Sequence, residues 1–256
     1  MNRRGVFRSR TLRRCLPVAV SCAVLFAASS IAVEAASGST VVNRKVPATG
    51  VSHVSGGAAW ESPVPDSAAE GLDSTRLIQD RLATLGYLSP AAVDGREGPD
   101  TATAIVAFQK WQGLPRTGTI DTRTRSALAR AARPTPIADG ANGRQLEVLV
   151  DRQLLLAVQG DRVVRTIDVS TGKPSTPTPV GSFDVYAKYP RWWSTPFSEW
   201  LLWAAPFSGG IAIHEFASVP SYAASHGCVR VTKYDARWVY RFVSVDTPVR
   251  VLASSR

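Results

Sequence analysis

Three side chains near residues 210–230 have the chemistry needed for acyl transfer. Cys228 and His226 stand two residues apart, and His214 follows an apolar run that precedes both. A thiol is a useful nucleophile as the thiolate, and an imidazole can take its proton near neutral pH. Cys228 with either histidine is therefore sufficient for covalent catalysis.

The spacing of these residues predicts how the chain holds them. If residues 225–231 are extended, His226 and Cys228 point to the same face of one strand. Gly227 between them leaves a bare backbone N–H, which we expect to face a developing oxyanion. His214 must come from another strand, and we expect Ser225 to support the loop by hydrogen bonding. Local geometry alone leaves either histidine as the base.

One family has this arrangement as its active-site signature. The L,D-transpeptidases of bacterial cell walls, the YkuD family, have a histidine, a loop, then Ser/Thr-His-Gly-Cys, an apolar residue and Arg or Asn. Two more segments, at residues 178–183 and 247–251, are similar to other motifs of the family. The chain departs from the pattern in a short loop after His214 and in Glu215. It resembles the signature at His214, Ser225, His226, Gly227, Cys228, Val229 and Arg230.

The resemblance implies a β-sandwich-like catalytic fold and a reaction without a cofactor. Cys228 would attack the carbonyl at the L-centre of the diamino acid in a tetrapeptide stem and release the terminal D-alanine. An amine of a neighbouring stem would then take the acyl group. In the family, His214 would be the proton donor and acceptor, with His226 supporting it. The implied partners are peptidoglycan stem peptides and glycan, and carbapenem-type β-lactams as inhibitors.

Three other interpretations stay open on the sequence. Water as acceptor would make the chain an L,D-carboxypeptidase that uses the same residues. A zinc site of His214, His226 and Cys228 is allowed by ligand type, but no fourth ligand has a characteristic spacing, so we predict no metal. A non-catalytic wall-binding protein would have no need for the histidine and cysteine set.

Residues 1–35 predict export. Six arginines precede an apolar stretch from Leu16 to Val33, and small residues follow, which is the pattern of a secretory signal peptide. We expect a secreted or cell-envelope protein, or one tethered to the membrane if the leader stays uncleaved. Cys15 and Cys22 lie in the leader, so the mature chain has Cys228 as its one cysteine and no internal disulfide.

The amount and distribution of charge bear on whether the partner is a wall polymer or a nucleic acid. The formal net charge is +10 at pH 7, and removing the leader with its six arginines and one glutamate leaves +5. A basic exported protein suits anionic wall polymers. The other arginines are scattered, with no basic stripe among aromatic residues, so we do not expect a nucleic-acid partner.

Two segments precede the catalytic region. Residues 36–72 are rich in Ser, Gly, Ala and Pro and predict a flexible linker. In residues 73–131, apolar residues at helical spacing and glycine turns predict three helices. Together with its Leu85-Gly86-Tyr87 and Val93-Asp94-Gly95 segments, this pattern resembles the small helical peptidoglycan-binding domain of wall enzymes. We expect its ligand near Asp94, Gln109 and Trp111.

The rest of the chain predicts a second, mainly-β domain. Prolines and glycines in residues 132–144 mark a linker. In residues 145–256, β-branched runs and short turns predict a sandwich, followed by one late helix from Lys233 to Ser244.

An aromatic cluster in this second domain has two interpretations. Its rings could pack the core, or some could form a wall or lid of the substrate groove. On the second interpretation, Trp203 is a candidate substrate-binding residue, with Tyr222 and Arg230. Arg230 could equally make a structural ion pair. The cluster contains Tyr186, Tyr189, Trp192, Trp193, Phe197, Trp200, Trp203 and Phe207.

Overall fold

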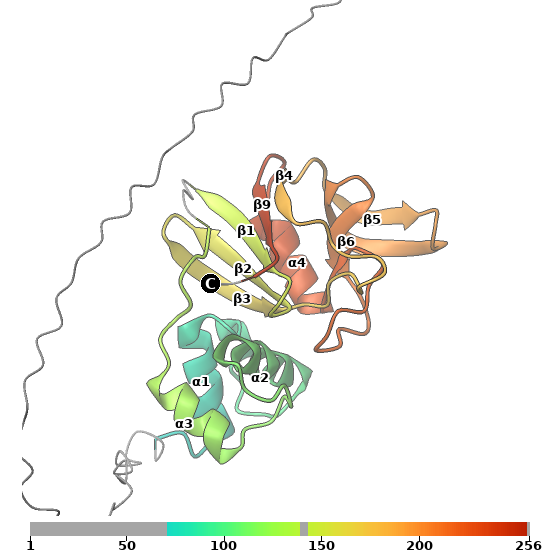
Figure 1. Cartoon of the computed structure of the whole chain (residues 1–256). Coiled ribbons are helices and arrows are strands. Elements are labelled where there is room, and N and C mark those ends of the chain that lie inside the picture. Colours follow the sequence, from blue (N-terminus) through green and yellow to red (C-terminus); the bar gives the residue numbers. More distant parts are fainter. Residues whose placement is uncertain (1–70, 139–142, 255–256) are drawn as a thin grey trace, which may run out of the picture. The chain divides into compact units, whose positions relative to one another are not determined.

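The computed structural model describes residues 71–138 and 143–254 (Figure 1). The predicted signal peptide and all but the last two residues of the predicted linker 36–72 lie outside these ranges. Within the described ranges, no helix is long and apolar enough to cross a membrane.

Residues 71–131 form a helical domain, as predicted. It contains α1 (Thr75–Leu85), a short 3-10 helix η2 (Pro90–Ala92), α2 (Pro99–Gln112) and α3 (Thr122–Arg130). The Ser74 hydroxyl accepts from the N–H of Leu77, and the Asp121 carboxylate accepts from the N–H of Thr124. These side chains satisfy backbone groups that a helix start leaves unpaired, which is why α1 and α3 begin where they do.

Residues 143–254 form a β domain of two sheets and one long helix, α4 (Lys233–Phe242). The helix ends two residues before the predicted Ser244. The five strands of the first sheet, in spatial order, are β3 (Arg162–Asp168), β2 (Leu154–Gln159), β1 (Arg144–Leu149), β9 (Pro248–Leu252) and β4 (Gly181–Asp184). The second sheet contains β5 (Tyr189–Ser194), β6 (Glu199–Ser208), β7 (Ile211–Glu215) and β8 (Val229–Val231).

Most neighbouring strands are antiparallel, and two pairs are parallel. β9 pairs with β1 in parallel and with β4 in antiparallel orientation, so the last strand lies inside the first sheet. β7 and β8 are also parallel, with His214 opposite Arg230. A core of apolar residues from both sheets and α4 lies between these elements. This mainly-β fold with a C-terminal helix confirms the predicted fold class.

Strand β2 is apolar on both faces because both faces are covered. Leu155 belongs to the core between the sheets, whereas Leu154 and Leu156 belong to a second buried cluster together with the core of the helical domain. An unbroken apolar run in a strand is typical of burial on two sides. This second cluster therefore contains residues of both the helical domain and the β domain.

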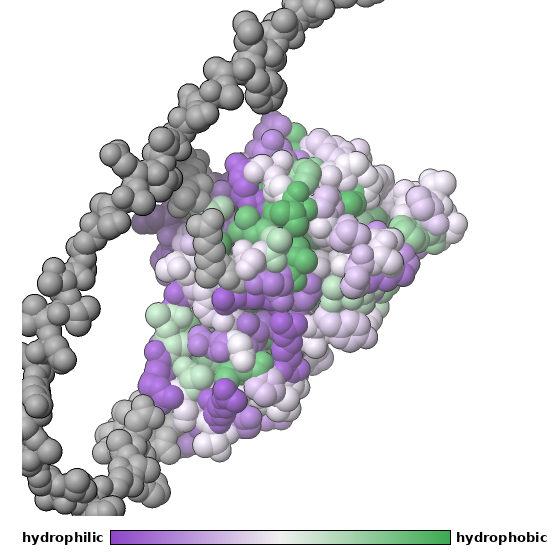
Figure 2. Space-filling model, in the orientation of Figure 1, coloured by the Kyte–Doolittle hydropathy of each residue, from purple (hydrophilic) through white to green (hydrophobic). Residues whose placement is uncertain are grey.

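The aromatic cluster lies mainly on the β5–β6 hairpin, which projects at the right of Figure 1. Phe207 is buried in the core and Trp203 packs partly against it. The packing interpretation is wrong for the exposed members of the cluster. The hairpin is pale in Figure 2 because tryptophan and tyrosine have intermediate values on this hydropathy scale. The exposed rings are those of Tyr186, Tyr189, Trp193, Phe197 and Trp200.

Candidate active site

His214 is a buried, neutral imidazole on strand β7. The residue is only 3% exposed, and its Nδ1 lies 2.7 Å from the carbonyl oxygen of Glu215. A carbonyl can only accept, so Nδ1 carries the ring proton and Nε2 keeps its lone pair. Burial lowers the pKa of His214 to about 4; the Glu215 carbonyl opposes this shift and the nearby Arg230 charge adds to it. The ring is therefore unprotonated at neutral pH.

Cys228 comes directly before β8, the strand that pairs with β7. It is a free, half-buried cysteine whose Sγ lies 3.9 Å from the carbonyl oxygen of Gly210. Burial raises the pKa of the thiol, while the Ala212 N–H and the Arg230 charge act in the opposite direction. Among the described residues, no hydrogen bond joins the thiol to either imidazole. At rest the site thus holds a neutral thiol and a neutral imidazole.

His226 is exposed and contacts two other side chains. Its Nε2 lies 3.2 Å from Nζ of Lys173, and its ring centroid lies 5.0 Å from that of Phe197 at the end of the β5–β6 hairpin. An ammonium group can only donate, so Nε2 of His226 accepts and Nδ1 carries the proton. Lys173 lies in no recognisable motif, so its contact with His226 had no sign in the sequence.

The segment that carries Cys228 is bent, so the predicted extended run over residues 225–231 is wrong. The Ser225 hydroxyl donates to the Cys228 carbonyl at 2.5 Å and accepts from the Gly227 N–H at 3.1 Å. Such side-chain hydrogen bonds compete with strand pairing. Gly227 has φ of +123°, which favours glycine, and β8 begins only at Val229. Ser225 thus makes two hydrogen bonds within this segment, and its role as loop support stays a prediction.

The Gly227 N–H is already engaged by Ser225, so it would face an oxyanion only after leaving that partner. Its expected role stays a prediction. The Gly227 carbonyl accepts from the buried Thr178 hydroxyl at 2.7 Å, and this hydroxyl accepts from the Gly172 N–H at 2.9 Å. Thr178 opens the motif of residues 178–183, which was therefore a signal for a residue that supports the site.

The three candidate substrate-binding residues lie in different surroundings. The Arg230 guanidinium stacks on Phe216, with Cζ 3.9 Å from the ring centroid, and makes no ion pair within the described residues. Tyr222 is 65% exposed on the loop before Cys228. The Trp203 ring packs against Tyr240 of α4, with centroids 5.5 Å apart, and is partly buried against the core between the sheets.

The structure also describes the surroundings of other residues singled out in the sequence. Within the described ranges, no three His, Cys, Asp or Glu side chains are grouped so that they could hold a metal ion. Gln109, expected near a ligand, is fully buried and bonds to the turn that follows α2. Asp94 accepts from Gln79 and from the Arg96 N–H, which is turn chemistry.

Comparisons with known proteins match both domains. Residues 143–251 match the model of the YkuD L,D-transpeptidase catalytic domain, and residues 72–128 match that of a peptidoglycan-binding domain. The crystal structure of an L,D-transpeptidase from Xylanimonas cellulosilytica is 34% identical, with a TM-score of 0.62. The similarity covers 69% of this chain and 92% of that one.

A curated relative matches over a shorter region. L,D-transpeptidase 1 of Mycobacterium tuberculosis is 35% identical over 107 residues, which cover 35% of this chain and 43% of that protein. The chain thus spans less than half the length of this relative. The catalytic-domain match contains the thiol, the buried imidazole and the bent Ser-His-Gly-Cys segment described above. The chain therefore belongs to the L,D-transpeptidase family, with a YkuD catalytic domain preceded by a peptidoglycan-binding domain.

Proposed function

We propose that this protein is an L,D-transpeptidase that cross-links peptidoglycan stems through a thioester on Cys228. One observation carries the proposal. Strand β7, which holds the neutral, buried His214, pairs with β8, and Cys228 comes directly before β8. A nucleophile and a proton acceptor held close together are the parts that acyl transfer requires.

His214 is the better placed proton acceptor of the two histidines. Its Nε2 has a free lone pair, because the Glu215 carbonyl holds the proton on Nδ1. Nε2 of His226 already accepts from the Lys173 ammonium. We therefore assign proton transfer to His214 and a supporting role at the entrance to His226.

The reaction has two balanced steps. In the first, the Cys228 thiol gives its proton to Nε2 of His214, and Sγ bonds to the carbonyl carbon at the L-centre of the diamino acid. The C–N bond to D-alanine breaks, and the leaving amine takes the proton from the imidazolium. In the second, an acceptor amine loses a proton to His214 and attacks the thioester, forming a C–N bond and returning the thiol. Water in place of the amine would give hydrolysis.

The setting we propose is the cell envelope. The basic, apolar leader in residues 1–35 supports export. The match of residues 72–128 to a peptidoglycan-binding domain supports peptidoglycan as the substrate. By the same proposal, carbapenem-type β-lactams acylate the Cys228 thiol, since they present a strained carbonyl to the same nucleophile.

A product assay tests this proposal. The purified protein without residues 1–35 is incubated with a disaccharide-tetrapeptide, and the products are followed by mass spectrometry. A dimer formed with loss of one D-alanine is the expected product. Tripeptide without dimer would replace transpeptidation by carboxypeptidation, and no product from a folded protein would contradict both activities.

Three variants and one inhibitor sharpen the assay. Cys228→Ala should give no product and no mass adduct with imipenem, whereas the unchanged protein should gain one adduct. His214→Gln should reduce turnover by about a hundred-fold or more, as loss of a general base does. His226→Gln should retain more activity than His214→Gln. The reverse order would exchange the roles of the two histidines.

A further inference from the structure

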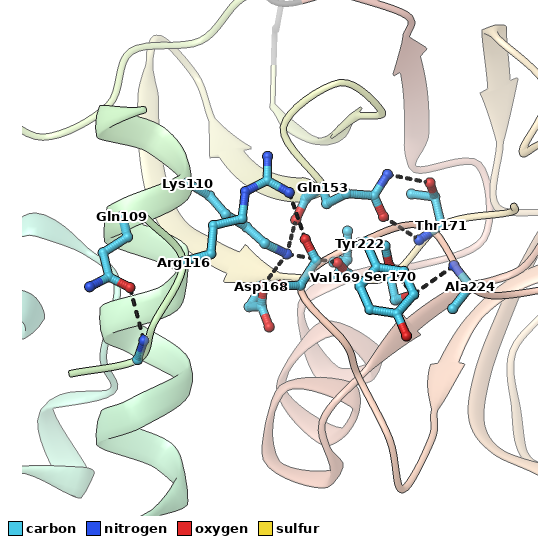
Figure 3. Close-up of polar contacts among 12 residues, drawn as sticks. Gln109, Lys110, Arg116, Gln153, Asp168, Val169, Ser170, Thr171, Tyr222 and Ala224 are labelled. Atoms are coloured by element: carbon cyan, nitrogen blue, oxygen red, sulfur yellow. Dashed lines mark hydrogen bonds and ion pairs between the residues drawn. The ribbon is translucent and has the colours of Figure 1, made fainter. Parts of the chain in front are cut away.

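Lys110 of helix α2 is buried against the β domain (Figure 3). Its Nζ donates to the carbonyl oxygens of Gln153 at 3.0 Å and Val169 at 3.1 Å, and it forms an ion pair with the Asp168 carboxylate. An ammonium group has three protons to donate, so these three partners use all of them. A helical-domain side chain is thus fully committed to the end of strand β3 and to the turn before β2.

The residues that follow β3 lead directly to the active site. The Ser170 N–H and carbonyl pair with the carbonyl and N–H of Arg230, at 3.1 and 3.0 Å. The Thr171 carbonyl accepts from the N–H groups of both Ala224 and Ser225 at 3.0 Å. Val169, which Lys110 holds, is therefore followed by two residues that hold the segment around Cys228. We call residues 168–173 the bridging segment and residues 216–228 the catalytic loop.

Gln153 makes a second connection between Lys110 and the bridging segment. Its side chain donates to the Thr171 hydroxyl at 2.7 Å and accepts from the Thr171 N–H at 2.8 Å. Its backbone has φ of +58°, a conformation that a non-glycine residue adopts only when its surroundings impose it. Lys110 binds the carbonyl of this same residue.

Arg116 contacts the catalytic loop directly. Its Nη1 donates to the Ser221 carbonyl at 2.6 Å. Arg116 lies in the turn after α2, and the buried Gln109 holds this turn by accepting from the Gly118 N–H at 2.9 Å and donating to the Thr119 carbonyl at 2.9 Å. The neighbouring Tyr222 carbonyl accepts from the Ser170 hydroxyl at 2.7 Å, so both routes meet in one part of the loop.

We propose that Lys110 and Arg116 are positioning residues of the active site, through which the peptidoglycan-binding domain sets the conformation of the catalytic loop. The inference rests on the proposed role of Cys228 as nucleophile. Reaction rates depend steeply on the placement of a nucleophile, so a loop that loses two of its outside supports should react more slowly even in a folded protein. The helical domain then serves catalysis as well as wall binding.

Arg116 offers the cleaner test because its side chain is exposed. Arg116→Gln places the only side-chain donor two atoms short of the Ser221 carbonyl without emptying a buried site, and Arg116→Lys keeps a long, charged donor. Arg123→Gln is the matched control, since this exposed arginine of α3 has no hydrogen bond to the β domain within the described residues. We expect Arg116→Gln to lower kcat for cross-linking by about ten-fold with KM little changed, Arg116→Lys to recover most of it, and Arg123→Gln to have no effect.

Lys110 is tested by a paired replacement, Lys110→Met with Asp168→Leu. Removing both partners avoids an unpaired buried charge, which a single replacement would leave. The rate of Cys228 alkylation by iodoacetamide, measured across pH and per folded molecule, reports loop placement independently of any stem substrate. We expect this rate to fall several-fold in the paired variant and in Arg116→Gln, with melting temperatures that leave each protein folded at the assay temperature.

Each outcome bears on the inference. Unchanged kcat and alkylation in Arg116→Gln and the paired variant would overturn it. A loss of activity explained wholly by loss of folded protein, with unchanged rates per folded molecule, would also overturn it. Slower alkylation in both variants, in a protein that forms no cross-linked dimer, would uphold the positioning role and contradict the proposed function.

Discussion

The Thr178 hydroxyl donates to the Gly227 carbonyl at 2.7 Å and thereby joins two segments that lie about fifty residues apart in the sequence. The hydroxyl also accepts from the Gly172 N–H, so it uses both of its hydrogen-bonding functions inside the protein. Gly227 lies between the two candidate active-site residues His226 and Cys228. The turn before β4 is therefore a support of the nucleophile.

Thr178→Val should weaken both stability and catalysis. Valine has nearly the shape of threonine but leaves the Gly172 N–H and the Gly227 carbonyl buried without this partner, which costs about 1–3 kcal/mol for each group. We expect the free energy of unfolding in urea to fall by about 2–6 kcal/mol for the two groups together, and acylation by imipenem to be slower. Thr195→Val, at an exposed position of the β5–β6 hairpin, is the control and should change neither.

The thiol of Cys228 should titrate above its ordinary range. Burial raises its pKa, and Arg230 limits the rise. We expect the rate of alkylation by iodoacetamide to keep increasing with pH beyond about 8.5, the usual cysteine value. Arg230→Gln should move the profile to still higher pH, and Arg230→Lys should move it less. A profile already flat near pH 5 would instead indicate a preformed thiolate–imidazolium pair.

His214 should make the stability of the protein depend on pH. The pKa of His214 is about 4 in the folded protein, whereas an unfolded histidine titrates near 6.5. Between these values only the unfolded chain takes up the proton, so the contribution of this site to stability is present above about pH 6.5 and falls by about 3 kcal/mol as pH is lowered to about 4.

The difference in unfolding free energy between the unchanged protein and His214→Gln isolates the contribution of His214. Burial raises the pKa of Asp168 to about 6, so that group stabilises the fold as pH falls, but it is present in both proteins and cancels. We expect the difference in unfolding free energy, measured in urea from pH 7 to pH 4, to change in favour of the variant. A difference that stays constant with pH would contradict the buried, neutral state of His214. His226→Gln is the exposed control.

Gly227→Ala should disturb the bent segment through its backbone. The glycine has φ of +123°, whereas an added Cβ would meet Ile211 only at an ordinary contact distance of 3.4 Å. Backbone strain of this kind costs about 1–3 kcal/mol, so we expect lower stability and a loss of acylation. Gly210→Ala is a suitable comparison. The φ of Gly210 lies outside the positive range that favours glycine, and no atom lies within 4 Å of the added Cβ. Equal effects of the two replacements on melting temperature and acylation would refute this explanation.

Local signals in the sequence predicted much of the fold. Ser74 and Asp121 fix helix starts through their own neighbours in the chain, so their role was readable from adjacent residues. The thiol and the two histidines were readable because few residue types perform nucleophilic and proton-transfer chemistry. The difference between the histidines was not, because it depends on the Glu215 and Lys173 contacts that the fold creates.

Features that depend on distant parts of the chain were predicted poorly. The bend at residues 226–228 arises because hydrogen bonds of the Ser225 hydroxyl replace strand pairing there. Trp193 and Trp200 are exposed because their hairpin extends beyond the sandwich. The burial of Lys110 was unexpected, since a lysine is ordinarily solvated unless it is paired. The apolar run Leu154–Leu156 was the one sequence sign that a second layer covers β2.

The position of β9 has a consequence for the order in which the protein becomes active. β4 has β9 as its one neighbour in the first sheet, and Thr178 stands just before β4. During synthesis, residues 181–184 have no strand to pair with until residues 248–252 have been added. We therefore expect the turn that supports Gly227 to become ordered only once β9 is present, so a nascent chain that already contains Cys228 would still lack this support. Such long-range pairing is also slow to form.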